Sequence, residues 1–155
     1  MRSARADCET VIVVDTTVLV YAVGQDHPLR EPSRRLVSAI TDGAIAATTV
    51  AGAITEFTHV RARRYGRADS TRLARRYVDL LTPLLPVRRE DLLDGLDLFE
   101  RHPGLSSFDA ALAAVAANRE AEALVSSDQA FGSIPGLAYV DPDGPEFEQL
   151  FLGPA

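Results

Sequence analysis

Lysine and tryptophan are absent from this chain of 155 residues, and cysteine occurs once, as Cys8. A single cysteine cannot form a disulfide within the chain. This is typical of proteins that fold in a reducing compartment, and we expect the cytoplasm. One cysteine and three histidines also provide no clustered set of zinc ligands. The composition therefore favours neither a disulfide-stabilised secreted domain nor a structural zinc site.

Long apolar runs are missing as well. No segment approaches the ~20 consecutive apolar residues that cross a bilayer. The apolar run at residues 11–14 is shorter than the ~7–15-residue core of a signal peptide, and Asp15 follows it at once. We therefore expect neither a membrane-spanning segment nor a targeting peptide.

Charge is unevenly distributed along the chain. The formal net charge is −6, which argues weakly against tight non-specific binding to polyanions. All 16 basic residues are arginine, however, and seven of them lie between Arg61 and Arg76. This band could contact a phosphate backbone, because arginine suits phosphate geometry. An equally good interpretation is a solvated helix face that forms ion pairs or contacts a protein partner.

Apolar periodicity predicts strands that alternate with helices. Four consecutive β-branched residues at 11–14 indicate a strand buried on both faces, as in a parallel sheet. The expected strands cover residues 11–14, 44–48, 83–87, 123–126 and 137–140, and the expected helices cover 16–23, 30–41, 50–64, 68–81, 90–101 and 106–118. This order predicts a single α/β domain over residues 1–155 with a mainly parallel sheet, in which residues 1–10 and 142–155 are peripheral.

Two aspartates stand just past the ends of expected strands. Asp15 follows the first strand and Asp128 follows the fourth. In open α/β sheets the ligand crevice lies outside the carboxyl ends of the strands, so these two carboxylates could converge. An aspartate after a strand is often only a helix N-cap or a turn residue. The hydroxyl pairs beside both of them, Thr-Thr after the first and Ser-Ser before the second, favour a functional site.

Two further acids lie on expected helices. Ser106 and Asp109 fit a capping box, which could account for Asp109 without any other role. The segment that follows, residues 110–117, is apolar nearly all round, which indicates a buried helix whose first turn faces the interior or a cleft. Glu56 lies at the border of the apolar stripe of its helix. That position suits a solvated glutamate and also permits a role in a site.

Four carboxylates in one crevice would repel one another strongly. A single pair at ~4 Å costs about 4 kcal/mol at an effective dielectric of about 20. Either some of them are protonated or cations neutralise the cluster. Oxygen ligands favour Mg²⁺ or Mn²⁺, and such ions, one or two of them, are commonly used to hydrolyse phosphodiesters.

The acidic residues and their neighbours resemble the PIN-domain family. The segments that carry the resemblance are Val-Val-Asp15-Thr-Thr-Val-Leu, Glu56 on a helix, Ser-Ser-Phe-Asp109-Ala-Ala and Ser-Ser-Asp128-Gln-Ala-Phe131. Their order and intervals, over almost the whole chain, are similar to those of bacterial VapC toxins. The resemblance implies a three-layer α/β/α sandwich and a metal-dependent endoribonuclease, the toxin of a toxin–antitoxin system.

The same resemblance implies the site and the partners. Asp15, Glu56, Asp109 and Asp128 would surround Mg²⁺ or Mn²⁺, with Thr16 or Thr17 as an accessory polar group. A VapB-type antitoxin would insert a C-terminal segment into the cleft, and a homodimer would place two sites in one groove. Many VapC sequences have a further acid two residues after the fourth; here that position is Ala130, so a fifth acidic ligand is not expected.

Other families fit less well. A haloacid dehalogenase phosphatase needs a second aspartate two residues after the first, where this chain has Thr17, and a lysine, which it lacks. A phosphoacceptor receiver domain fails for want of the same lysine. The alternative from another class is a non-catalytic PIN-like module that binds RNA or protein. His59 and Cys8 are assigned no role in the site.

Overall fold

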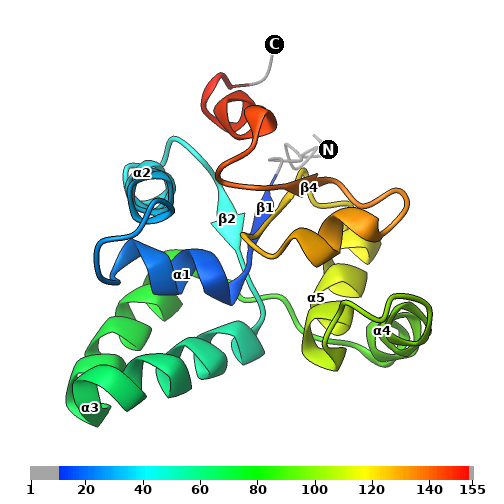
Figure 1. Ribbon diagram of the computed structural model, residues 1–155, viewed down its shortest axis with the longest axis horizontal. Helices are drawn as coiled ribbons and strands as arrows, with labels where there is room; N and C mark the ends of the chain where they lie inside the picture. Colours follow the sequence, from blue (N-terminus) through cyan, green and yellow to red (C-terminus); the bar gives the residue numbers. More distant parts are fainter. Residues whose placement is uncertain (1–10, 154–155) are drawn as a thin grey trace, which may run out of the picture.

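The computed structural model describes residues 11–153 and contains a four-stranded parallel sheet between two layers of helices (Figure 1). The strands are short: β1 (Ile12–Val14), β2 (Ala47–Thr48), β3 (Leu124–Val125) and β4 (Tyr139–Val140). Their order across the sheet is β2-β1-β3-β4, and each neighbouring pair is parallel. The sheet confirms the expected α/β class.

Both faces of the central strand β1 are buried, which explains its unbroken run of β-branched residues. Ile12 and Val14 point into one hydrophobic cluster, whereas Val13 points into a second cluster on the opposite face. Leu124 of β3 lies in the second cluster beside Val13, its register partner, and Val125 lies in the first. The period of two along the strands thus divides the core into two layers.

The first cluster is covered by α1 (Thr16–Ala22), α2 (Arg30–Thr41) and α3 (Ala51–Leu81). The second is covered mainly by α5 (Ser107–Asn118), on which α4 (Arg89–Arg101) packs from outside. Figure 1 shows these two groups of helices on opposite sides of the strands. The architecture is therefore the three-layer α/β/α sandwich that the resemblance implies.

The helices expected at residues 50–64 and 68–81 are the two arms of one bent element, α3. Gly66 lies at the bend with φ 83° and ψ 170°, a combination that is essentially restricted to glycine. Figure 1 shows the two arms meeting at an angle.

The short strand expected at residues 83–87 does not form. Only one isolated parallel bridge, between Val50 and Leu85, is present there, and the amide of Leu85 donates to the carbonyl of Thr49 at 2.9 Å. Pro83 and Pro86 flank this bridge and have no amide hydrogen, so the ladder cannot continue on either side.

The last described segment packs against the core. A 3₁₀ helix, η2 (Pro145–Phe151), follows β4, and Phe147 within it is only 4 % exposed. Arg35 of α2 pairs with Glu148 and stacks over Phe151, which ties η2 to α2. η2 is therefore attached to the core, although we expected residues 142–155 to be peripheral; residues 1–10, with Cys8, lie outside the described residues. No helix within residues 11–153 has the length and apolarity required to cross a membrane.

Candidate active site

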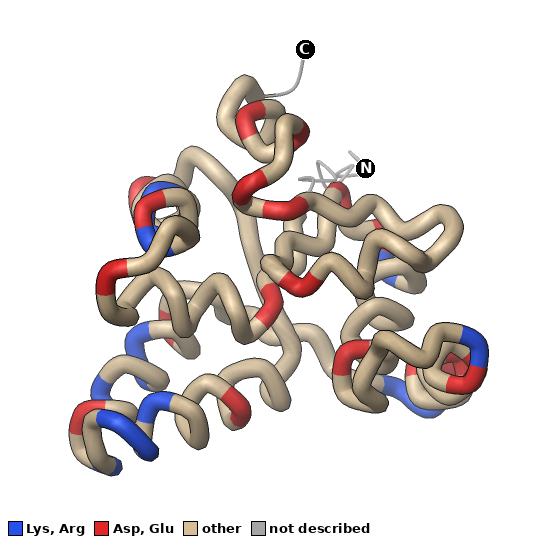
Figure 2. Tube along the Cα trace, in the orientation of Figure 1, with Lys and Arg blue, Asp and Glu red and all other residues tan. Residues whose placement is uncertain are grey.

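The candidate site lies at the carboxyl ends of β1 and β3. Asp15 follows β1 directly and precedes α1, while Asp128 stands between β3 and the 3₁₀ helix η1 (Gln129–Ser133). Glu56 lies in the first arm of α3 and Asp109 in the first turn of α5. Figure 2 shows acidic positions from these elements around the middle of the molecule. The topology of the sheet brings together residues that are far apart in the sequence.

Asp15 is held by two hydroxyl groups. Its side chain is buried, and its Oδ2 accepts hydrogen bonds from Thr17 Oγ1 at 3.0 Å and from Ser126 Oγ at 2.7 Å. Asp15 is the N-cap residue of α1, but its carboxylate makes no capping hydrogen bond. The interpretation of Asp15 as a simple helix cap therefore does not account for its side chain.

Glu56 is linked to the same region through Thr16. The buried hydroxyl of Thr16 donates to Glu56 Oε2 at 3.0 Å and also lies 3.4 Å from the carbonyl oxygen of Ala53. Glu56 itself is exposed. The contact fixes one carboxylate oxygen of α3 against the first residue of α1.

Asp128 and Asp109 both have capping geometry. Asp128 Oδ1 accepts from the amide of Ala130 at 3.0 Å, and the Asp128 amide donates to Ser126 Oγ at 3.0 Å. The Asp109 amide donates to Ser106 Oγ at 3.1 Å, which is one half of the expected capping box. The structural interpretation is thus correct for both residues, and it leaves one oxygen of Asp128 and the carboxylate of Asp109 available for other contacts.

The four carboxylates share one electrostatic environment. Burial raises the pKa of Asp109 to about 6, and the negative charges of Asp15, Asp128 and Glu56 contribute to the rise. Among residues 11–153 no salt bridge involves any of the four. Their mutual repulsion is therefore not relieved by a basic side chain in the described part of the chain.

Comparison with known proteins gives the same family. The family model described as "PIN domain" matches residues 12–137, most of the chain. The chain belongs to the PIN-domain family. It is 51 % identical over 138 residues to Ribonuclease VapC7 of Mycobacterium tuberculosis, covering 86 % of this chain and 92 % of the relative. Ribonuclease VapC23 of the same species is 36 % identical over 99 residues, covering 64 % of this chain and 78 % of the relative.

Two solved structures have the same fold. The crystal structure of VapBC2 from Rickettsia felis bound to a DNA fragment from their promoter matches with a TM-score of 0.65, covering 84 % of this chain and 98 % of that one at 13 % identity. FitAcB from Neisseria gonorrhoeae matches with a TM-score of 0.63, covering 84 % and 97 % at 16 % identity. At these identities the likeness shows the PIN fold alone.

The donor chemistry of this PIN domain suits a hard divalent cation. All four candidate ligands are carboxylates, and the pKa of Asp109 is raised first by burial and then by the negative charges of the other three. As the side chains stand, no three Asp, Glu, His or Cys residues in the described range 11–153 lie close enough together to hold a metal ion. The charge and the donor types fit a cation, whereas the side-chain positions would have to close around it.

The expected accessory group was Thr16 or Thr17, and in the structure both hydroxyls contact acids of the site. Thr17 donates to Asp15 and Thr16 donates to Glu56, while Ser126, for which the sequence pattern predicted no role of its own, also donates to Asp15. The Thr-Thr and Ser-Ser pairs were visible in the sequence. Which hydroxyl faces the carboxylate depends on how the chain turns after β1 and β3, and the sequence pattern does not contain that information.

Proposed function

We propose that this PIN domain is a metal-dependent endoribonuclease, the toxin of a type II toxin–antitoxin module, which hydrolyses RNA phosphodiester bonds. The observation that carries the proposal is that Asp15 and Asp128 meet at the ends of β1 and β3, where the Ser126 hydroxyl contacts both residues, and that Glu56 joins them through Thr16. The charges of these three acids also act on Asp109, whose pKa is raised to about 6 mainly by burial. The VapC ribonucleases among its relatives support the choice of RNA as substrate. We also propose that the protein acts in the cytoplasm, where such RNA is found.

Asp15, Glu56, Asp109 and Asp128 would hold Mg²⁺ or Mn²⁺. When bound, such a cation supplies activation of the attacking water and neutralisation of charge at the cleaved phosphate. The chain's own contribution is to orient the ligands. Thr17 and Ser126 fix Asp15, and Thr16 fixes Glu56, in the way that outer residues commonly position metal ligands.

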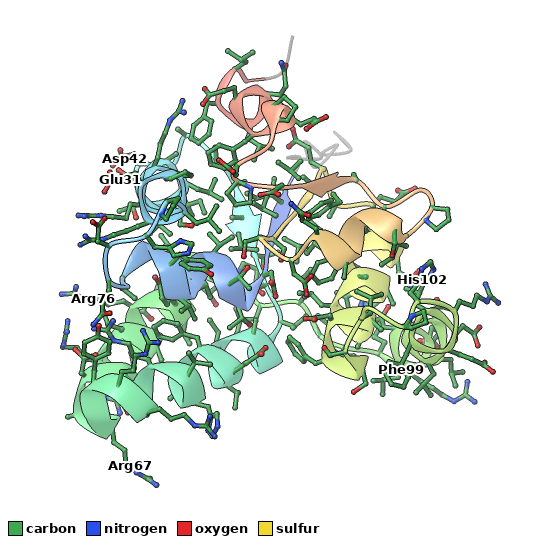
Figure 3. All side chains as sticks on the ribbon, in the orientation of Figure 1. Glu31, Asp42, Arg67, Arg76, Phe99 and His102 are labelled. Carbon is green, nitrogen blue, oxygen red and sulfur yellow. The ribbon has the colours of Figure 1, made fainter. Side chains whose placement is uncertain are left out.

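Two partners complete the proposal. A VapB-type antitoxin is proposed because the fold matches a VapBC complex and the relatives are VapC proteins. A second copy of the chain is proposed to pack on α4, where Leu92, Leu93, Leu96 and Phe99 are between 45 % and 58 % exposed. Figure 3 shows Phe99 extending from α4 away from the rest of the molecule. An exposed apolar set of this kind on one helix is typical of a protein interface.

The proposed activity is tested with purified protein, single-stranded RNA and Mg²⁺. We expect the wild type to cut the RNA. Asp109→Asn should lower the cleavage rate by more than about 100-fold, because loss of a residue that only orients a metal ligand costs roughly 10–100-fold. Asp97→Asn, which removes an exposed acid of α4, should cut like the wild type. Removing a repelling carboxylate should leave the fold intact, so circular dichroism should be unchanged; an unfolded Asp109→Asn protein would mean that Asp109 is structural.

The metal requirement is tested separately. EDTA should stop cleavage, and Mg²⁺ or Mn²⁺ should restore it; full activity in chelator would contradict the metal mechanism. If both the wild type and Asp109→Asn bind RNA and neither cuts it, the protein is the non-catalytic binding module instead.

A further inference from the structure

The two arms of α3 enclose a groove with a volume of about 550 Å³. Hydroxyl, imidazole and guanidinium groups from both arms line it together with a few small apolar side chains. The lining residues are Ile54, Thr55, Thr58, His59, Ala62, Arg67, Ser70 and Thr71. None of them belongs to the acidic site. Apolar atoms form most of the exposed lining, and the polar groups set among them could bind a sugar-phosphate chain.

The groove lies on the same arm of α3 as Glu56, but Glu56 does not line it. Thr55 and Glu56 point about 100° apart around the helix, and His59, about one turn after Glu56, lies between Glu56 and the groove. His59 is exposed and therefore accessible to a ligand. A chain lying in the groove would therefore have to pass over His59 to reach the carboxylate of Glu56.

Arginines around the groove divide into two groups. Arg61 and Arg72 both pair with Asp69, at 2.7 Å and 3.0 Å, and Arg61 also donates to the carbonyl of Val23 at 2.6 Å. These two hold the bend of α3 together. For Arg61 and Arg72, the interpretation of the band as a helix face that forms ion pairs is therefore correct.

The other arginines of the band have no such role. Arg63, Arg64, Arg67, Arg75 and Arg76 are exposed, and none forms a salt bridge within residues 11–153. Figure 2 shows basic positions gathered at the bend of α3, and Figure 3 shows Arg67 extending outward from it. Arg67 lines the groove, and Arg63 lies two turns after Glu56, a rise of about 10 Å.

A polyanionic substrate needs such positive charge at this place. The chain carries a formal net charge of −6, and the four acids of the site would repel an RNA backbone. Arginines beside the acids can offset that repulsion by contacting the phosphates that flank the cleaved bond. α3 supplies them, with seven arginines against three acids.

We propose that the groove between the arms of α3 is a subsite for the backbone of single-stranded RNA, in which Arg67 contacts a phosphate in the groove, Arg63 contacts a phosphate on the side of the helix that carries Glu56, and His59 lies between them. The inference rests on the proposed nuclease function. It assigns RNA, rather than an acidic protein segment, to the unpaired arginines of the first arm and the bend.

The test compares two double variants that remove the same charge from the same helix. Arg63→Ala/Arg67→Ala changes the groove and its approach, whereas Arg75→Ala/Arg76→Ala changes exposed arginines that do not line it. Both are made in the wild type for cleavage and in Asp109→Asn for binding, so that bound RNA stays intact. The probe is a short labelled single-stranded RNA, titrated over a range of salt concentrations, and polyglutamate is titrated as an acidic polypeptide.

We expect the groove variant to bind RNA about tenfold more weakly at low salt. The slope of log K against log salt should fall by about 1.4, because each phosphate contact with a single strand contributes about 0.7. In cleavage, KM should rise while kcat at saturating RNA changes little. The Arg75/Arg76 variant should stay close to the wild type in all of these measurements, and circular dichroism should show both variants folded.

Three results would overturn the subsite. Equal losses in the two double variants would mean that only the total charge matters. Unchanged RNA binding and KM in the groove variant would mean that the groove takes no RNA, and a loss of polyglutamate binding alone would assign it to a protein. A wild type that cuts no RNA would contradict the proposed function instead, so the two failures are distinguishable.

Discussion

Asp15 is a buried carboxylate that is held by hydroxyl groups. An ionised carboxylate in the interior is costly unless hydrogen bonds or a cation compensate for its lost hydration. Thr17 and Ser126 both donate to the same oxygen, Oδ2, and no salt bridge in residues 11–153 includes Asp15. This arrangement orients the side chain without neutralising it, which suits a residue whose charge is needed by a cation.

Ser126→Ala tests this orienting role. Ser126 is fully buried, and the variant removes the shorter of the two hydrogen bonds to Asp15 together with the acceptor of the Asp128 amide. We expect the Mg²⁺ concentration for half-maximal RNA cleavage to rise about 10–100-fold, as for other partners that orient metal ligands. Metal titrations of activity and of thermal stability should report the same shift.

Ser127→Ala is the matched control for this change. Ser127 contributes only its amide to the network, which donates to Thr17 Oγ1 at 3.2 Å, so loss of its hydroxyl should leave the metal titration unchanged. Equal behaviour of the two alanine variants would show that Ser126 merely fills space.

At the scale of elements, local patterns predicted most helices and strands correctly. The exceptions depend on contacts between distant segments. The bend at Gly66 joins two expected helices into α3, and the bridge between Val50 and Leu85 is limited by prolines on both sides. Phe147 is buried because η2 packs against α2, which no local period reveals. For the same reason the sequence could propose four acids and a threonine beside the first, but not that Ser126 contacts Asp15.

The attachment of α4 to the end of α5 is another such long-range contact. The Asp91 side chain is 1 % exposed and accepts two hydrogen bonds from Arg119, at 2.8 Å and 2.9 Å, and one from Asn118 at 2.9 Å. It also accepts from the amide of Arg88 at 2.8 Å, which closes the first turn of α4. The Arg119 guanidinium holds the pKa of Asp91 well below its usual range.

Asp91→Asn should therefore destabilise the protein by about 1.5–3 kcal/mol, the range for hydrogen bonds to charged groups. The lowered pKa also sets the pH dependence. The ionised Asp91 stabilises the fold fully above its unfolded pKa of about 4, and this stabilisation decreases as the pH falls below that value. Urea unfolding should show that the wild-type advantage shrinks from about pH 4 towards about pH 2. A difference in the free energy of unfolding that stays constant over that range would contradict an ionic role. The control Asp97→Asn changes an exposed position of α4 and should change the free energy of unfolding little at any pH.

At the scale of the whole molecule, the sandwich separates three surfaces. The acids lie at the carboxyl ends of the strands, the arginine band of residues 61–76 lies on α3, and the exposed apolar residues of α4 lie beyond α5 on the other side of the sheet (Figure 1). A second copy on α4 would therefore leave the groove of α3 open to RNA. Catalysis, substrate binding and assembly can then be altered independently by substitution.

The α4 surface has the features of a two-fold interface. Leu92, Leu96 and Phe99 recur at helical spacing, and Arg89 and Glu100 stand near opposite ends of α4. In an antiparallel pair of α4 helices, these charges would lie near their opposites. A stable interface buries about 1,200–2,000 Å² in total, so the apolar residues would form its centre, with neighbouring surfaces adding to the area.

Leu96→Asp should therefore convert a dimer into a monomer. At 58 % exposure, Leu96 has the largest exposed fraction of the α4 set, and two symmetry-related aspartates at the centre of the contact would be desolvated and would repel each other. Light scattering coupled to gel filtration should give twice the chain mass for the wild type and one chain mass for the variant. Leu152→Asp places the same charge at a leucine that is 73 % exposed and lies outside α4, and it should remain dimeric.

A monomeric wild type at micromolar concentration would exclude the dimer. A dimer that survives Leu96→Asp would place the contact elsewhere and leave the apolar face of α4 to another partner, such as the antitoxin.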